Sequence, residues 1–468
     1  MNRSFARRAT GISILACGGW TAAHAQVPEP CEPQRLVAPT TVTPFSFGSE
    51  IVTNGDYWFV ADRSAGTVCS GPPLECGTGA VFVYQEIDGS LEHVQTIVPP
   101  DVRLYDNFGV GMDVDGDRLI VGSMGAEWPG TGVRQGISYI YELQGGLWVE
   151  TGRLRPPAEV SEAFGRDVYL SGDVALVASR RPRSVYRYEL VDGQWIQQET
   201  LSPPDPHGQR ECFGCTGMAF DEWFFIATFL DGTVSDGAGS VYAYRKRPDN
   251  TLEFIQKIES AGTGGFGHGI DYDGQTLAIG AMYTHRDVLY QGVVQTYLFD
   301  GTQWVLEQEM THDDPIEPSV FGISVSVKGD TLLATETATR TGTVQGRVVR
   351  FERRPGVGWQ EVGDLVAAPP VYARDFGEPV VMHDGRVLAG APEEIDASGS
   401  LIGAAYFFDL ACTDCPADLD ADGALTNFDF LTYLNLFQDG DALADFDGDG
   451  ELTIFDFLAF QDAFQAGC

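Results

Sequence analysis

A Phe-Gly dipeptide recurs seven times along this chain and limits the folds that it can adopt. The intervals between successive copies run from 49 to 61 residues, and the copies stand at Phe47, Phe108, Phe164, Phe213, Phe266, Phe321 and Phe376. A nearly fixed period of this length indicates one repeated unit whose neighbouring copies bury a shared core. The fold of the chain therefore depends on the secondary structure of one repeated unit.

Each unit has the pattern of four short strands. Alternating apolar and polar residues follow Phe-Gly, and then come a run such as Leu119–Gly122, a Tyr-rich run such as Tyr139–Tyr141, and a run such as Trp148–Leu154. Pairs such as Gly116-Asp117 separate the runs and accept the positive φ angles of tight hairpins. Seven such units predict an all-β fold, a seven-bladed β-propeller spanning residues 31–412.

The two ends of the repeat region predict how the propeller closes. The seventh unit ends after its third strand, Ala405–Leu410, and a segment with the pattern of a fourth strand, Gln34–Pro39, precedes the first Phe-Gly. We expect this N-terminal strand to complete the last blade and to pair with its edge. Adjacent antiparallel strands would then bring Cys31 and Cys412 together, and we predict a disulfide between them.

Residues 1–25 are predicted to be a signal peptide. Basic residues precede the apolar stretch Gly11–Ala16, and Ala23-His24-Ala25 fits a cleavage site. The expected location is extracellular or on the cell surface, with the periplasm as a further possibility. A lipid anchor on Cys17 stays open as an alternative to free secretion. No other stretch is long and apolar enough to span a membrane, so no transmembrane segment is expected.

The charge of the chain excludes some partners. It has 67 acidic and 29 basic residues, for a formal net charge of -38. Nucleic acids and anionic membranes are bound through Lys and Arg, so neither is an expected partner. The acidic surface is interpreted as a solubilising one.

Eight of the nine cysteines would remain after removal of the signal peptide, and export favours disulfides. Cys69 and Cys76 flank a Gly-Pro-Pro loop and are predicted to pair. Cys212 and Cys215 form a lone C-x-x-C without two further zinc ligands, so a local disulfide is expected there too.

The repeat resembles the bacterial FG-GAP repeat family. Phe376-Gly377 followed by Gly390-Ala391-Pro392 is a literal copy of its pattern, and the resemblance extends over roughly residues 34–410. It implies a propeller related to the integrin α-chain head. The calcium loop that such repeats often carry is replaced here by a tight turn, so Asp113, Asp115 and Asp117 are interpreted as turn and strand-face residues.

The composition changes in the last domain, residues 413–468. Two Asp-rich segments recur at an offset of 27 residues, with Gly423 and Gly450 at equivalent places. An EF-hand-type loop takes oxygen ligands from positions 1, 3, 5, 7, 9 and 12 and needs Gly at position 6. The predicted ligands of two calcium ions are Asp418, Asp420, Asp422, Ala424, Thr426 and Asp429, and then Asp445, Asp447, Asp449, Glu451, Thr453 and Asp456.

Each loop leads into apolar residues at helical spacing, and no helix precedes either loop, so these are paired half EF-hands. Such duplicated loop-helix units, with Asp at position 12, resemble dockerins. The flanking Cys415-Pro416 and Gly467-Cys468 are similar to the GC type. The resemblance implies a small α-helical, calcium-binding module that binds a cohesin-like or other cell-envelope protein. We predict that Cys415 and Cys468 form a disulfide that joins its ends.

No catalytic set stands out in the propeller. Neither Gly-x-Ser-x-Gly nor His-Glu-x-x-His occurs, and the Gly-rich segment 262–267 precedes a strand, where no helix N-terminus faces a phosphate. The longer loops should emerge on one face of a four-strand meander. The candidate ligand-binding residues in these loops are Tyr105, Trp128, Arg134, Arg286, Tyr290 and Arg374.

Two functions follow from this sequence. The first is an exported, non-enzymatic interaction or scaffold propeller that is tethered by its calcium-dependent tail. The alternative is a carbohydrate-active or other hydrolase or lyase that the same tail delivers. An enzyme of that kind should show paired carboxylates in a central pocket, whereas a binding module should show unperturbed carboxylates and an aromatic or charged loop face.

Overall fold

The computed structural model describes most of the chain. The described residues are 33–39, 46–65, 77–204, 213–228, 238–260, 264–284, 291–312, 319–338, 345–367, 375–396, 399–410, 417, 419, 425, 427–446 and 452–466.

Seven four-stranded antiparallel sheets form the propeller. Blades 1 to 3 contain β2 (Phe47–Thr53), β3 (Trp58–Asp62), β4 (Ala80–Ile87) and β5 (Ser90–Ile97); β6 (Phe108–Asp115), β7 (Arg118–Ser123), β8 (Ile137–Gln144) and β9 (Leu147–Leu154); and β10 (Val168–Ser171), β11 (Val174–Ser179), β12 (Ser184–Val191) and β13 (Gln194–Leu201). Blades 4 and 5 contain β14 (Gly217–Phe220), β15 (Trp223–Thr228), β16 (Ser240–Lys246) and β17 (Leu252–Ile258); and β18 (Phe266–Tyr272), β19 (Thr276–Ala281), β20 (Val293–Phe299) and β21 (Trp304–Met310). Blades 6 and 7 contain β22 (Ser319–Lys328), β23 (Thr331–Ala338), β24 (Arg347–Arg354) and β25 (Gly358–Leu365); and β26 (Val380–His383), β27 (Arg386–Ala391), β28 (Ala404–Asp409) and β1 (Gln34–Leu36).

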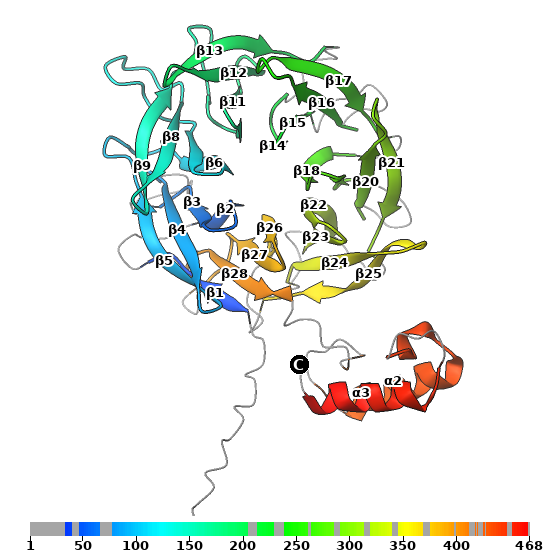
Figure 1. Ribbon diagram of the computed structural model, residues 1–468. Helices are drawn as coiled ribbons and strands as arrows, with labels where there is room; N and C mark the ends of the chain where they lie inside the picture. Colours follow the sequence, from blue (N-terminus) through cyan, green and yellow to red (C-terminus); the bar gives the residue numbers. More distant parts are fainter. Residues whose placement is uncertain are drawn as a thin grey trace, which may run out of the picture.

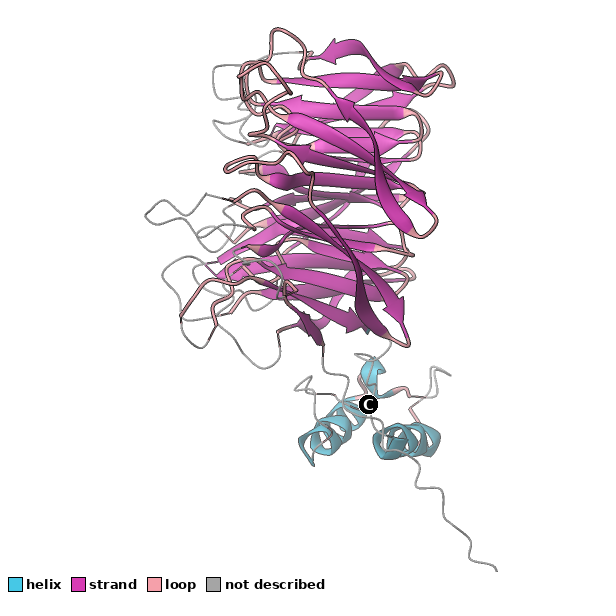
Figure 2. Ribbon diagram, turned by 90° about the vertical axis from the view of Figure 1, so that its left-hand side faces the viewer, coloured by secondary structure: helices cyan, strands magenta, loops and turns pink. Residues whose placement is uncertain are grey.

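The sheets stand around one axis (Figure 1). The first strand of each blade lies at the centre and the last strand at the rim, and the side view shows the sheets packed face to face (Figure 2). The all-β, seven-bladed prediction is confirmed.

The N-terminal strand closes the circle, as the sequence predicts. β1 pairs antiparallel with β28, with Leu36 opposite Ala405, so the last sheet has the order β1-β28-β27-β26. Arg35 next to this seam forms an ion pair with Glu394, which also accepts a hydrogen bond from the Tyr406 hydroxyl at 2.8 Å. Pairing the two ends of the repeat covers the otherwise free edge of β28 and leaves the short strand β1 as the outer edge of blade 7.

The Phe-Gly dipeptide is explained by packing and by backbone conformation. All seven phenylalanines are at most 1% exposed. Phe108 packs edge-to-face on Tyr139 of its own blade at 5.5 Å between ring centroids, and Phe376 packs on Tyr406 in the same way. All seven following glycines have φ between +79° and +90°. A Cβ at Gly48 would also lie 2.3 Å from the carbonyl oxygen of Ala404, so only Gly fits.

Two helices follow the propeller, α2 (Asn427–Asp439) and α3 (Ile454–Ala466), with a 3₁₀ turn, η1 (Ala442–Ala444), between them. They share a small core in which the rings of Tyr433 and Phe460 stack at 4.2 Å. The predicted loop-helix duplication is therefore seen in its helices. Among the described residues, no helix has the length and apolar character needed to cross a membrane.

Candidate functional site

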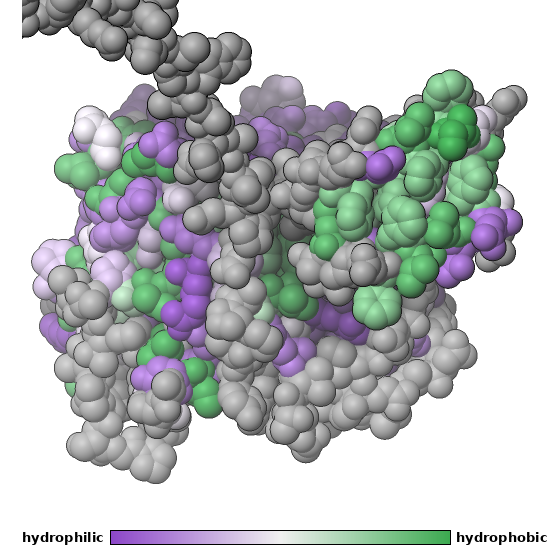
Figure 3. Space-filling view, turned by 90° about the horizontal axis from the view of Figure 1, so that it is seen from below, coloured by the Kyte–Doolittle hydropathy of each residue, from purple (hydrophilic) through white to green (hydrophobic). Residues whose placement is uncertain are grey.

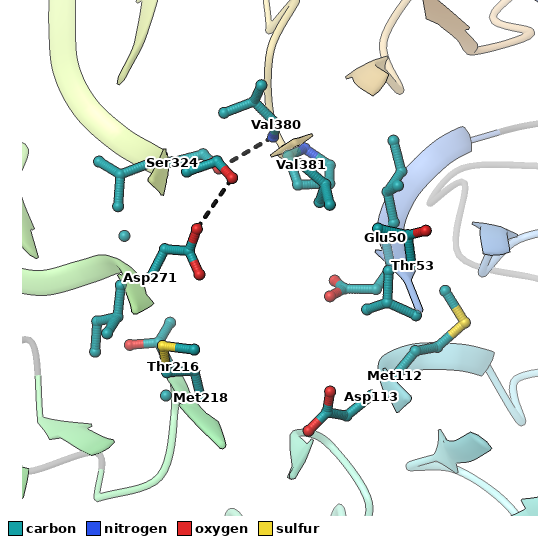
Figure 4. Close-up of a pocket in the computed structure, with 18 of the residues that line it drawn as sticks. Glu50, Thr53, Met112, Asp113, Thr216, Met218, Asp271, Ser324, Val380 and Val381 are labelled. Atoms are coloured by element: carbon teal, nitrogen blue, oxygen red, sulfur yellow. Dashed lines mark hydrogen bonds between the residues drawn. The ribbon is translucent and has the colours of Figure 1, made fainter. Parts of the chain in front are cut away.

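A central channel runs between the innermost strands of the seven blades. Its cavity has a volume of about 520 Å³ and is lined from β2, β6, β10, β14, β18, β22 and β26. Figure 4 shows the carboxylates of Glu50, Asp113 and Asp271 directed into this space from three different blades. Asp167 and Glu378 line the same cavity. Among the charged residues that line the described part of the channel, acidic ones thus outnumber basic ones.

Burial shifts the acidity of these five carboxyl groups. It raises the pKa of Glu50 and of Asp113 to about 8. It raises the pKa of Asp167 and of Glu378 to about 7, and that of Asp271 to about 6. Desolvation of the charged form is the largest cause in each case. At neutral pH the channel therefore holds protonated and ionised carboxyl groups together.

Neighbouring charges raise the pKa of some of these carboxyl groups and lower that of others. The carboxylates of Asp167 and Asp113 raise the pKa of Glu50 further, and the guanidinium of Arg63 opposes them. Arg63 lies directly after β3 and is exposed, and it also lowers the pKa of Glu378. One arginine thus offsets part of the repulsion between carboxylates.

Two of the five carboxylates join neighbouring blades. Asp271 Oδ2 accepts hydrogen bonds from the backbone N–H of Val327 at 2.7 Å and from the hydroxyl of Ser326 at 3.0 Å. Asp113 Oδ2 accepts one from the N–H of Leu170 at 2.7 Å. Each bond crosses from the inner strand of one blade to that of the next. Asp113 and Asp271 therefore have a structural role irrespective of any ligand.

Glu50, Asp167 and Glu378 are different, because their carboxyl groups form no hydrogen bond with any described residue. They stand two or three residues after the phenylalanine of their blade, whereas Asp113 and Asp271 stand five residues after it. With about 3.3 Å per residue along a strand, they form a separate layer of the channel. Asp167 Oδ2 lies 3.6 Å from Arg166 Nε. These three are the channel carboxylates best placed to bind a ligand or transfer a proton.

His268 is the histidine of this layer. Its Nδ1 lies 2.9 Å from the backbone carbonyl oxygen of Ile323, which fixes the ring, and burial lowers its pKa. A neutral imidazole beside protonated and ionised carboxyl groups can exchange protons with a bound molecule. The arrangement can bind a cationic or polyhydroxylated ligand, or catalyse acid–base chemistry on one.

The loop residues predicted from the sequence are only partly brought together. Tyr105 is exposed, with a φ of 70°, and Trp128 packs against the core of blades 1 and 2. Arg134 is already engaged, because it forms an ion pair with Asp106 at 2.7 Å and donates to the carbonyl oxygen of Leu104. The remaining candidates lie outside the described residues: Arg286, Tyr290 and Arg374.

Most of the predicted calcium ligands and disulfides also lie outside the described residues. These are Asp418, Asp420, Asp422, Ala424, Thr426, Asp447, Asp449, Glu451, Cys31, Cys69, Cys76, Cys212, Cys412, Cys415 and Cys468. Cys215 is disulfide-bonded.

Four ligand candidates of the tail are described. Asp429 and Asp456, at position 12 of each loop, are fully buried in the first turn of α2 and α3. Asp429 accepts a hydrogen bond from the N–H of Leu419, and Asp456 from that of Thr453. Both carboxylates thus contact the segment that precedes their helix, where a calcium ligand at position 12 is needed. Asp445, at position 1 of the second loop, is partly buried.

The channel carboxylates were not singled out from the sequence, although a signal for them exists. Aligning the residues that follow each Phe-Gly places Glu50 and Asp167 at the same position and Asp113 and Asp271 at another. The interpretation of Asp113 as a turn or strand-face residue was incomplete, because its strand is the innermost of its blade and its free face is the channel.

Comparison with known proteins shows the fold alone. No protein-family model matches the chain, and no curated protein sequence matches it. Among solved structures it is similar to the β-propeller domain of Cps50 (Swd1) from Myceliophteria thermophila, with a TM-score of 0.51, 12% identity, and coverage of 80% of this chain and 99% of that one.

Two further similar structures have lower TM-scores. One is the periplasmic gluconolactonase PpgL of Pseudomonas aeruginosa, with a TM-score of 0.42, 16% identity, and coverage of 72% of this chain and 93% of that one. The other is a putative 6-phosphogluconolactonase of Bacteroides uniformis, with a TM-score of 0.45, 13% identity, and coverage of 68% and 85%. At 12% identity the similarity to the Cps50 domain shows the β-propeller fold alone, and none of the three comparisons indicates an activity.

Proposed function

We propose that this protein is an exported, non-enzymatic interaction protein in which a calcium-dependent C-terminal module docks on a protein partner and the propeller binds a ligand. The observation that carries the proposal is an exposed apolar surface on the two helices of the module. Phe428 and Leu431 of α2 are 68% and 53% exposed, and Phe455 and Leu458 of α3 are 64% and 46% exposed.

The internal repeat places the same exposed apolar residues on both helices. Phe428 and Phe455 occupy equivalent positions of the 27-residue repeat, and so do Leu431 and Leu458. Residues three apart lie on one face of a helix, so each helix presents the same apolar pair. Figure 3 shows apolar side chains gathered on the module. Contiguous apolar surface on a small soluble module is typical of a protein–protein docking site.

Calcium binding in the acidic loops would fix the position of the docking surface on the helices. Two ions would be held by the acidic loops, with the buried carboxylates of Asp429 and Asp456 as the last ligands. A bound ion neutralises carboxylates that otherwise repel one another, and it fixes each loop at the start of its helix. The exposed phenylalanines stand one residue before these two carboxylates, so metal binding would fix their positions.

The predicted partner is a cohesin-like or other cell-envelope protein, and the predicted location is the cell surface or the extracellular space. A suitable test is binding of the full chain to the envelope fraction of the producing cell. Phe428→Ser and Phe455→Ser should each weaken binding, and the double variant should abolish it. Leu443→Ser removes an exposed apolar residue of η1 and is the matched control. Equal binding by the double variant and the wild type would refute the docking surface.

A second function, the hydrolase or lyase, is favoured by one specific observation. Glu50, Asp167 and Glu378 line one channel with raised pKa values, and a protonated carboxyl group near an ionised one is what glycoside hydrolysis uses. The test is turnover of a panel of polysaccharides and chromogenic glycosides by the wild type, Glu50→Gln and Glu378→Gln. Turnover lost in both variants would favour the enzyme, and no turnover by the folded wild type would count against it.

A further inference from the structure

A second cluster of ionisable side chains lies in blade 6, away from the channel. His312 follows β21, Glu336 lies on β23, Arg347 begins β24, and Glu361 and Asp364 lie on β25. His312 and Glu336 are almost completely buried, whereas Glu361 and Asp364 are about one-fifth exposed. The cluster therefore has a buried side and a side open to solvent.

The backbone of β25 brings the two outer carboxylates together. Residues three apart on a regular strand point to opposite faces of the sheet. The pairing of β24 with β25 shifts between Arg350 and Phe351, where Gly363 and Glu361 are the successive partners. This bulge inserts an extra residue, which turns Glu361 and Asp364 to the same side.

The side chains meet at ligand distances. His312 Nε2 lies 3.2 Å from Glu361 Oε1, and its Nδ1 lies 3.1 Å from Glu336 Oε2. One ring nitrogen of His312 and one carboxylate oxygen each from Glu361 and Asp364 all lie within 4.8 Å of one another. Arg347 holds the outer side of the cluster, with Nη1 2.9 Å from Asp364 Oδ2 and Nε 2.8 Å from Glu336 Oε2.

The charges of these five side chains do not balance. Three carboxylates contribute -3 and Arg347 contributes +1, so the sum is -1 with the protonated form of His312, which its two carboxylate neighbours favour, and -2 once a metal ion replaces the proton on Nε2. Buried charge is costly unless it is compensated. A divalent cation would bring the sum to zero. A calcium or magnesium ion would prefer oxygen ligands alone, whereas an imidazole with two carboxylates suits zinc and related ions.

We propose that His312, Glu361 and Asp364 bind a divalent transition-metal ion of the zinc class, with Glu336 and Arg347 as positioning residues. Zinc lies about 2.0–2.2 Å from nitrogen and oxygen ligands, so two tetrahedral ligands are roughly 3.3 Å apart. The 3.2 Å between His312 Nε2 and Glu361 Oε1 is close to that separation. Three protein ligands leave a fourth position for solvent on the exposed side.

The positioning residues have the roles that such sites need. A metal-bound histidine commonly donates its other ring N–H to a carboxylate, which fixes the tautomer and the ring orientation. Nδ1 of His312 lies 3.1 Å from Glu336 Oε2 and 3.0 Å from Arg347 Nη2. In the tautomer whose Nδ1–H donates to Glu336, the lone pair of Nε2 is directed to the side of Glu361. Arg347 donates to Asp364 Oδ2, so the other oxygen of Asp364 is the one to bind the metal.

The test uses the full chain, stripped with a chelator and returned to saturating calcium so that the acidic tail loops are filled. Zinc is titrated by calorimetry, and cobalt(II) is titrated by its visible absorption, which reports imidazole and carboxylate ligation. We expect one equivalent of either ion in the wild type. His312→Gln and Asp364→Asn should lose it, and Glu336→Gln should weaken it by about 10- to 100-fold. His93→Gln, at an exposed histidine on β5, is the matched control and should bind as the wild type does.

Each result of the metal titration either supports or overturns the proposed site. If folded wild type binds no zinc, the proposal is overturned and the cluster is an ion-pair network. Binding that persists unchanged in Asp364→Asn and His312→Gln places the metal elsewhere and also overturns it. Circular dichroism checks each variant. Should His312→Gln fail to fold, Asp364→Asn, whose side chain is partly exposed, decides the question.

Discussion

Replacing Glu50 with Gln should make the protein more stable, but only at neutral and alkaline pH. Burial raises the pKa of Glu50 from its ordinary value of 4.5 to about 8. A carboxyl group whose pKa is raised in the folded state contributes stability that is fully present below its unfolded pKa. That stability is lost as the pH rises through the folded pKa. Glu50 should therefore destabilise the fold progressively between about pH 5 and pH 8.

The size of the effect follows from the same shift. Each pKa unit corresponds to about 1.4 kcal/mol, so the undiminished penalty would be roughly 5 kcal/mol. Glu50 is only partly buried and faces a channel that admits water, so screening should leave about 1–2 kcal/mol. Glu50→Gln should thus match the wild type near pH 4.5 and exceed it by about 1–2 kcal/mol near pH 8.5.

The assay is urea unfolding followed by tryptophan fluorescence at a series of pH values and constant calcium. Glu92→Gln is the control, because Glu92 is exposed on β5, and its difference from wild type should not change with pH. A Glu50→Gln difference that stays flat, or that shrinks as the pH rises, would refute the argument that the channel desolvates this carboxyl group.

Three further predictions concern packing. Phe376→Ala should cost about 3–5 kcal/mol of unfolding free energy in urea, because the ring is fully buried against Tyr406, while Leu147→Ala at an exposed site should cost under about 1 kcal/mol. Leu36→Asp buries a charge in the closing seam and should lower the thermal midpoint, with a loss of roughly 2–4 kcal/mol; an unchanged midpoint would mean that β1 does not hold the ring. Tyr433→Ala should remove about 3–5 kcal/mol from the tail core, and limited proteolysis should then cut the tail; resistance equal to wild type would contradict the stacked core.

Much of the fold could be predicted from the sequence because its signals are local and repeated. Each Phe-Gly copy needs a glycine with positive φ and a buried ring, and seven copies reinforce one interpretation. The closing strand was predictable for a similar reason, since one unit lacks a fourth strand and an unused strand precedes the first unit. The pairing of Leu36 with Ala405 confirms it.

The candidate sites were less predictable because they depend on long-range geometry. Whether Glu50 and Asp113 face a channel depends on how seven sheets close and on which strand of each is innermost. His312 and Glu336 are 24 residues apart in the sequence, and β25 brings its two carboxylates to the cluster only through a bulge. No short sequence motif indicates that these side chains form a cluster. Arg134 was predicted to contact a ligand, but in the structure its guanidinium forms an ion pair with Asp106.

Calcium-dependent docking of the C-terminal tail can be measured on isolated cell envelopes. The full chain and its Phe428→Ser/Phe455→Ser double variant are incubated with isolated envelopes of the producing cell, in calcium and then in chelator, and the bound fraction is measured. We expect that the wild type is retained in calcium and released by chelator, and that the double variant is not retained in either condition. Retention that ignores both calcium and the two phenylalanines, or no retention of the wild type at all, would contradict it.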